Sequence, residues 1–142
     1  MKQKKQIRPF HLAFPVLNLK KAEEWYTEIL GCSVGRKSKD WVDFNLYGHQ
    51  IVAHLTDVIN FDGTNNVDGN NVPIRHFGVI LSITLWHELV NRLNNLNIKF
   101  LIKPHIRFEN LKGEQHTLFI KDPDGNVLEF KAFKNDTMIF DN

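Results

Sequence analysis

The chain has little of several features that would place it in a specialised class of protein. Only one cysteine, Cys32, occurs among its 142 residues, so no disulfide can form within the chain and a reducing, cytoplasmic setting is expected. No apolar run approaches the roughly 18 residues that a membrane-spanning helix needs, and none follows the basic start, Lys2–Lys5, as it would in a signal peptide. The net charge is only +2, which is too small to favour nucleic acid or a membrane as partner.

The composition that remains is that of an ordinary globular protein. Hydrophobic residues make up 42% and charged residues 24% of the chain, and this length is enough to bury a sizeable core in one domain. We expect Cys32 to be a small buried hydrophobic residue, because no base is placed to activate its thiol. Evidence of function therefore has to come from the arrangement of the polar residues.

The first part of the chain, about residues 7–56, has the pattern of a strand, a helix and three further strands. Alternation of apolar residues predicts the first strand over 8–16. An apolar stripe predicts a helix over 19–30, which Asn18 can cap and Gly31 can end. Three short strands are expected at 33–37, 41–46 and 49–55, with Tyr47-Gly48 as a tight turn between the last two.

The same pattern restarts over about residues 73–133. We predict a strand over 73–82 and a helix over 85–96 capped by Thr84. Three more strands are expected at 99–102, 115–121 and 126–133, with Asp122-Pro-Asp-Gly125 as the turn between the last two. Each half is thus a βαβββ module. The sequence predicts a single α+β domain in which paired modules form a curved, cup-like mixed sheet with helices outside.

Three segments fall outside this regular pattern. Residues 57–72 are rich in Asn, Asp and Gly, which disfavours regular structure and suits a linker between the modules. Residues 134–142 are a mostly polar tail. Residues 103–114 form an extra loop in the second module, and a loop of this length is more often functional than idle.

Candidate metal ligands occur at matching places in the two modules. His11 and His76 lie on the first strand of each module, and His54 and Glu129 lie on the last. Alternation places each of them on the strand face opposite an apolar run. Because an unpartnered buried carboxylate costs several kcal/mol, one shared divalent cation would satisfy the whole set. Gln50 shares the face of His54 and could take the same polar role.

The ligand types narrow the choice of metal. Imidazoles with one carboxylate suit Fe(II), Mn(II), Zn(II), Ni(II) or Co(II) rather than Ca(II). Two His and one Glu leave open coordination positions, as in non-haem Fe(II) oxygen chemistry. His105 and Arg107 in the extra loop are candidates to contact substrate, and Arg would suit a carboxylate or enediolate-like anion; the alternative is an ordinary surface loop.

Two motifs are similar to those of a known family. The helix motif Ala22-Glu-Glu-Trp-Tyr-Thr-Glu-Ile-Leu-Gly31 and the ending Asp122-Pro-Asp-Gly-Asn-Val-Leu-Glu-Phe130 resemble the vicinal oxygen chelate superfamily. That superfamily includes glyoxalase I, extradiol dioxygenases, and fosfomycin- and bleomycin-resistance proteins, and the resemblance covers about residues 8–133. More narrowly, the segments 41–55 and 103–108 resemble a bacterial subgroup of predicted extradiol-type dioxygenases.

The resemblance implies a cup of paired modules around a divalent metal, and a homodimer. It implies metal ligands at His11, His54, His76 and Glu129, of which His11, His76 and Glu129 match the two His and one Glu that hold Fe(II) in extradiol dioxygenases. His54 falls where glyoxalase I has a carboxylate ligand, so His54 is a candidate ligand or a catalytic acid or base. The chain is also much shorter than typical two-domain extradiol enzymes.

The function expected from these residues is that of a metal-dependent enzyme whose small-molecule substrate binds the ion through adjacent oxygens. A dioxygenase-like reaction with Fe(II) is favoured, with His54, His105 and Arg107 as catalytic candidates. One alternative is a glyoxalase-type lyase or isomerase, or a thiol transferase, that uses Ni(II), Zn(II) or Mn(II). Another is a resistance protein that binds a drug without turnover.

Overall fold

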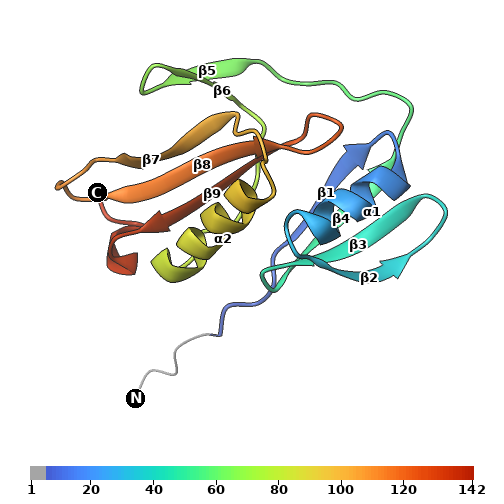
Figure 1. Ribbon diagram of the computed structural model, residues 1–142, viewed down its shortest axis with the longest axis horizontal. Helices are drawn as coiled ribbons and strands as arrows, with labels where there is room; N and C mark the ends of the chain where they lie inside the picture. The colour runs from blue at the N-terminus through green and yellow to red at the C-terminus, as the bar shows by residue number, and fades with distance from the viewer. Residues whose placement is uncertain (1–5) are drawn as a thin grey trace. The chain divides into compact units, whose positions relative to one another are not determined.

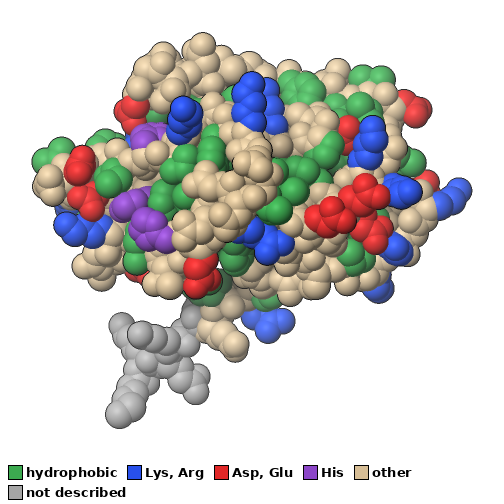
Figure 2. Space-filling model, in the orientation of Figure 1, with side chains coloured by type: hydrophobic (Ala, Val, Ile, Leu, Met, Phe, Trp, Pro, Cys, Tyr) green, Lys and Arg blue, Asp and Glu red, His purple; other side chains and the backbone are tan. Residues whose placement is uncertain are grey.

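The computed structural model describes residues 6–142, so Lys2–Lys5 lies outside the described residues (Figure 1). The chain divides into two compact units after Ile59, inside the predicted linker, and each unit is described by itself. None of the helices formed by residues 6–142 is long and apolar enough to cross a membrane. The face in Figure 2 carries basic as well as acidic side chains.

The first unit is a βαβββ module, as predicted. Its sheet has the order β1-β4-β3-β2, in which β1 runs parallel to β4 and the other pairs are antiparallel. The two-residue turn at Tyr47-Gly48 is confirmed, since both residues have positive φ. The elements are β1 (His11–Val16), α1 (Leu19–Glu28), β2 (Ser33–Lys37), β3 (Trp41–Leu46) and β4 (His49–Leu55).

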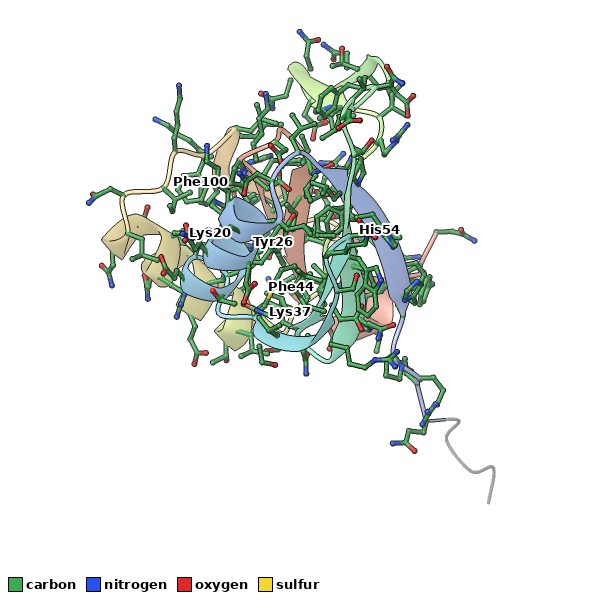
Figure 3. The ribbon with its side chains drawn as sticks, turned by 90° about the vertical axis from the view of Figure 1, so that its right-hand side faces the viewer. Lys20, Tyr26, Lys37, Phe44, His54 and Phe100 are labelled. Atoms are coloured by element: carbon green, nitrogen blue, oxygen red, sulfur yellow. The ribbon has the colours of Figure 1, made fainter. Side chains whose placement is uncertain are left out.

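Helix α1 covers one face of this sheet. Its predicted cap is confirmed, because the Asn18 side chain accepts a hydrogen bond of 2.9 Å from the Lys21 amide. Tyr26 is fully buried, with its ring stacked 5.1 Å from Phe44 of β3 (Figure 3). Burying Phe44 contributes about 1.5–3 kcal/mol. The alternation places Phe14, Phe44 and Ile51 on the helix side, and His11, Asp43, Gln50 and His54 on the other face, where Val52 is buried as well.

The second unit repeats this topology. Its sheet has the order β7-β8-β9, and the segment before α2 pairs in parallel with β9 through Phe77↔Leu128 and Ile80↔Lys131. Helix α2 packs on β9, where the Trp86 indole donates a 2.9 Å hydrogen bond to the carbonyl of Phe130. The predicted βαβββ order is confirmed in this unit as well, with its first β element reduced to two isolated bridges. Its elements are β5 (Thr64–Val67), β6 (Asn70–Pro73), α2 (Ile83–Asn95), β7 (Ile102–Arg107), β8 (Gln115–Lys121), β9 (Val127–Phe133) and the 3-10 turn η1 (Asp136–Met138).

The predicted turn before β9 is also confirmed. Asp122 Oδ1 accepts hydrogen bonds of 2.9 Å from the amides of Asp124 and Asn126, and Gly125 has a φ of 86°. Buried Asp122 therefore fixes where β8 ends and β9 begins. This register places Phe119 directly opposite Glu129.

The structure corrects the prediction that residues 57–72 lack regular structure. Strands β5 and β6 form an antiparallel hairpin there, in which Val67 pairs with Asn70. Its two turn residues, Asp68 and Gly69, have φ of 51° and 83°, which suits the type I′ turn of a hairpin. The segment therefore forms a hairpin around its Asp-Gly turn although its polar composition favours a loop.

Three details of the second unit were also predicted wrongly: a helix cap, the bounds of a strand, and the extent of its first strand. Helix α2 is capped by Ser82 rather than Thr84, and the Ser82 hydroxyl accepts from the Leu85 amide at 3.3 Å. Strand β7 spans 102–107 rather than 99–102, so much of the predicted extra loop is strand and only 108–114 remain between β7 and β8. The predicted strand over 73–82 pairs with β9 only at two isolated bridges.

Candidate metal centre

The second unit brings two of the predicted metal ligands together. Nε2 of His76 lies 3.4 Å from Oε1 of Glu129. The Glu129 side chain is 12% exposed and that of His76 is 28% exposed, so both are sheltered but reachable. The two residues are 53 positions apart in the sequence, and only the pairing of the segment before α2 with β9 makes them neighbours.

A close backbone approach at Gly78 makes this pairing possible. The Phe77 carbonyl accepts a 2.9 Å hydrogen bond from the Glu129 amide, and the Leu81 amide donates a 2.8 Å bond to Lys131. Between them, a Cβ added at Gly78 would lie 1.6 Å from the Glu129 carbonyl oxygen. The absence of a side chain at Gly78 therefore lets His76 come within reach of the Glu129 carboxylate.

Hydrogen bonds fix which atoms the pair presents. Nδ1 of His76 lies 2.8 Å from the carbonyl oxygen of Pro73, and because a carbonyl only accepts, Nδ1 carries the proton. The lone pair of a neutral His76 ring is then on Nε2 and faces a carboxylate oxygen, which is also an acceptor. The other carboxylate oxygen accepts a 2.6 Å hydrogen bond from the Thr117 hydroxyl. Two acceptors that face each other need a proton or a cation between them, and this donor set fits a divalent metal.

The pKa values of the pair show the same electrostatic coupling. Burial acts to raise the pKa of Glu129, but hydrogen bonds from His76 and Thr117, with the charge of Lys131, bring it below its ordinary value. The hydrogen bond to Glu129 raises the pKa of His76 in spite of burial, and the Pro73 carbonyl adds to the rise. Both shifts have the direction expected if the carboxylate stabilises a proton on Nε2 of His76.

We predict that this proton can be observed directly. In EDTA-treated protein, His76 should titrate above 6.5, and in Glu129→Gln its pKa should fall. The raised pKa of His76 contributes stability that is complete below pH 6.5 and is lost as the pH rises through the higher pKa of the folded protein. The lowered pKa of Glu129 contributes stability that is lost as the pH falls through the lowered pKa of the folded protein. An NMR titration of the histidine ring protons measures the effect, and a wild-type His76 that titrates below 6.5 would contradict the geometry.

A small cavity of about 170 Å³ opens beside the pair. This volume is below the roughly 300–1,000 Å³ of pockets for drug-sized ligands, so it suits a small molecule. The hairpin and the sheet both contribute to its walls. They are lined by Val67, Asp68, Asn70, Val72, His76, Ile102, His105, Arg107, Thr117, Phe119 and Glu129.

The catalytic candidates His105 and Arg107 both line this cavity, from β7. Nδ1 of His105 lies 2.9 Å from the carbonyl oxygen of Lys103, so the neutral ring again has its lone pair on Nε2. Nε of Arg107 donates a hydrogen bond to the carboxylate of Asp68 in the hairpin. The guanidinium of Arg107 lies 4.8 Å from the centre of the Phe108 ring. The structure thus gives the cavity a base and a cation besides the His76–Glu129 pair.

The first unit holds His11 by a similar device. Nδ1 of His11 lies 2.7 Å from Oε1 of Gln50, and Nε2 of Gln50 is 3.5 Å from the buried Asp43 carboxylate. With its amide turned toward Asp43, Gln50 presents its oxygen to His11, so Nδ1 of His11 is the donor. The lone pair on Nε2 of His11 is therefore available for a cation, as it is in His76.

His54 lies elsewhere on the same sheet. In the register of β4 it pairs with Pro15 and Trp41, whereas Gln50 pairs with His11 (Figure 3). Four residues along a strand span about 13 Å, so the first unit does not bring His54 beside His11. Within each unit, the described residues form no group of three or more His, Cys, Asp or Glu that could hold a metal ion.

Sequence reasoning missed several residues that shape these sites. Thr117 orients Glu129 and Asp43 orients Gln50, but the sequence near Thr117 and Asp43 does not indicate this, because strand pairing brings each to its partner. Gln50 was weighed only as a substitute for His54, whereas the structure makes it the partner of His11. Asp68 was assigned to a linker, although its Asp-Gly pair was a hairpin signal.

Comparisons with known proteins agree with this architecture. A crystal structure titled glyoxalase/bleomycin resistance protein/dioxygenase from Alicyclobacillus acidocaldarius is 32% identical, with a TM-score of 0.79, and the alignment covers 99% of this chain and 100% of that one. A variant of the fosfomycin resistance protein FosX from Listeria monocytogenes, complexed with Mn(II) and 1S,2S-dihydroxypropylphosphonic acid, is 16% identical with a TM-score of 0.66, covering 98% of both chains. Lactoylglutathione lyase from Agrobacterium tumefaciens is 18% identical with a TM-score of 0.61, covering 92% of this chain and 96% of that one.

The last two likenesses show the fold alone, because so few residues are identical. No protein of curated function matches the chain significantly in sequence. Residues 8–130 match the model of one family. The predicted resemblance is thereby confirmed, and the chain belongs to the Glyoxalase/Bleomycin resistance protein/Dioxygenase superfamily, whose members include metalloenzymes and drug-resistance proteins.

Proposed function

We propose that the protein is a metal-dependent enzyme whose substrate binds the ion through two adjacent oxygens. The observation that carries the proposal is the pair in the second unit: Nε2 of His76 and Oε1 of Glu129 lie 3.4 Å apart as two acceptors. The other polar atom of each side chain is hydrogen bonded: Nδ1 of His76 donates to the Pro73 carbonyl, and Oε2 of Glu129 accepts from the Thr117 hydroxyl. Partners of this kind, which orient ligands from outside, are typical of metal sites.

The remaining ligand in this proposal is His11, of the same chain or of the partner chain in a homodimer. We prefer His11 to His54 because Gln50 fixes the His11 ring, whereas no described residue makes a hydrogen bond to the ring of His54. His54 then stays a candidate acid or base. Two His and one Glu would leave coordination positions for two substrate oxygens.

When bound, the metal supplies Lewis acidity to the substrate oxygens. The other steps belong to the chain's own residues. His105 lines the cavity, and because its Nδ1 is directed at the Lys103 carbonyl, Nε2 of the neutral ring can accept a substrate proton. Phe119 packs edge-on against the His76 ring with centroids 5.3 Å apart, which helps to hold the orientation of this ligand. Arg107 offers a cation to an anionic group of the substrate.

We favour Fe(II) and a dioxygenase-like reaction, because two neutral imidazoles and one carboxylate are the ligand set of non-haem Fe(II) oxygen chemistry. Protein loaded with Fe(II) under anaerobic conditions should then consume O₂ when a catechol is added, and Glu129→Gln should not. The test is O₂ uptake across a panel of catechols. If no member of the panel causes uptake, the dioxygenase version of the proposal is wrong.

A second candidate is chemistry that needs no O₂, with Mn(II), Zn(II) or Ni(II). The similar FosX structure favours it, because its ligands are Mn(II) and a phosphonic acid that carries adjacent hydroxyls. Turnover of a diol, epoxide or thiol adduct with several redox-inert ions would support this candidate. Binding without turnover in either assay would instead support a drug-binding resistance protein.

A further inference from the structure

The hairpin β5–β6 forms part of the cavity wall, and an ion pair joins its tip to β7. The carboxylate of Asp68, at the tip of the hairpin, pairs with Nε of Arg107, the last residue of β7. Val67 and Val72 of the hairpin pack with Phe119 and Val127, so its apolar side is anchored in the unit. The hairpin therefore closes the cavity through its polar tip, and the closing contact uses a cationic side chain of the cavity wall.

Arg107 has binding capacity beyond this contact. Its bond to Asp68 uses Nε, which is one of the five N–H donors of a guanidinium. Its side chain is 23% exposed, whereas that of Asp68 is 51% exposed, so the carboxylate is the partner that water can solvate more readily. Phe108 stacks against the guanidinium and would keep it in place after Asp68 leaves. The arrangement resembles a cationic site occupied by a substitute carboxylate.

The strand register places Arg107 across the sheet from Glu129 of the metal pair. Thr117 of β8, which is hydrogen bonded to Glu129, lies opposite His105 of β7, and Arg107 is the next residue of β7 on that face. Two strand spacings, about 10 Å, separate β9 from β7 across the sheet, and Arg107 is offset from Glu129 by four residues, about 13 Å, along the strands, because Arg107 pairs with Gln115 and Gln115 with Phe133. Both long side chains line the same cavity, so a small molecule bound there by the metal ligands can meet Arg107 with its other end.

We propose that the substrate is a small anion, with a carboxylate, phosphate or phosphonate, whose charged group displaces Asp68 from Arg107 and releases the tip of the hairpin. This rests on the proposed function for the metal end of the substrate but not for the Arg107 end. The other charges in the cavity permit an anion there, because the Glu129 carboxylate is engaged by His76, Thr117 and Lys131. Among the described residues, Asp68 is the one acidic side chain that pairs with Arg107.

The test uses inorganic phosphate as the probe and EDTA-treated full-length protein, so that no metal contributes to binding. Asp68→Asn should bind phosphate about threefold more tightly, since the competing pair is partly exposed and contributes modestly. Arg107→Met should bind at least about tenfold more weakly, because it loses a charge-assisted contact. The NMR signal of the Gly69 backbone amide should shift when phosphate is added to the wild type.

The matched control is the exposed ion pair Arg75–Asp62, whose atoms are 2.9 Å apart and which does not line the cavity. Arg75→Met and Asp62→Asn should leave phosphate binding unchanged.

Three results would overturn the proposal: no phosphate binding by the wild type, Arg107→Met that binds as well as the wild type, or Arg75→Met that weakens binding as much as Arg107→Met. Zn(II) affinity of the same variants separates this proposal from the proposed function. If Zn(II) binds as expected but phosphate does not, only the anion site fails. If phosphate behaves as expected but Zn(II) does not bind, only the metal function fails.

Discussion

Replacing Gly78 by alanine is expected to destabilise the protein by about 3 kcal/mol or more. The added Cβ would lie 1.6 Å from the Glu129 carbonyl oxygen and 2.7 Å from its carbonyl carbon. Overpacking against movable side chains typically costs about 1–3 kcal/mol, but here the obstacle is the backbone of β9. The segment would have to move outward and lose the hydrogen bond between the Phe77 carbonyl and the Glu129 amide. His76 would move away from Glu129 with it.

Gly63→Ala is the matched control for this variant. Gly63 is in the same unit, has no positive φ, and a Cβ there would meet only the tip of the Ile74 side chain at 3.9 Å. Urea unfolding followed by circular dichroism measures both variants. The expected result is a large loss for Gly78→Ala and a change within about 0.5 kcal/mol for Gly63→Ala. Equal stability of the two variants would contradict the pairing of this segment with β9.

Glu129→Gln is expected to weaken binding of a divalent metal by about 100-fold or more. The loss of an orienting partner outside the ligands already costs 10–100-fold, and this variant removes a charged ligand itself. The fold should survive, because the glutamine amide can donate a hydrogen bond to the lone pair on Nε2 of His76. Metal affinity and thermal unfolding of the same variant therefore separate loss of the ligand from loss of the structure.

Glu114→Gln is the control for this second variant. Glu114 is a buried glutamate of the same unit and accepts a 2.7 Å hydrogen bond from the Asn110 amide, but it does not line the cavity. Isothermal titration with Zn(II) should give near wild-type affinity for Glu114→Gln. Wild-type affinity in Glu129→Gln as well would show that the carboxylate is not a ligand.

Local patterns in the sequence were sufficient to predict the repeated order of elements. The alternation in β1 and β9 placed His11 and Glu129 opposite the apolar faces, and the structure confirms this because Leu128 and Phe130 are fully buried while Glu129 is not. The Asn18 cap and the turn at Asp122 were predicted from residues within a few positions of each other. These features depend on neighbours in the chain, so the sequence alone carries them.

The features that were missed depend on pairing over long distances. The register that sets Gln50 beside His11 arises from the parallel pairing of β1 with β4, 39 residues apart. The role of Gly78 depends on the approach of β9. Within single segments, the errors came from competing signals: Ser82 and Thr84 can both cap a helix, and Asp68-Gly69 lies in a stretch whose composition otherwise favours a loop.

Anomalous diffraction from crystals grown with Zn(II) tests the central claim most directly. The proposal requires an ion within about 2.0–2.2 Å of both Nε2 of His76 and a carboxylate oxygen of Glu129, since these are ordinary lengths for such bonds. The same map would identify the remaining ligands, for which we expect His11 of either chain. An ion bound elsewhere, with His76 and Glu129 still paired only to each other, would contradict the assignment of this pair as a metal centre.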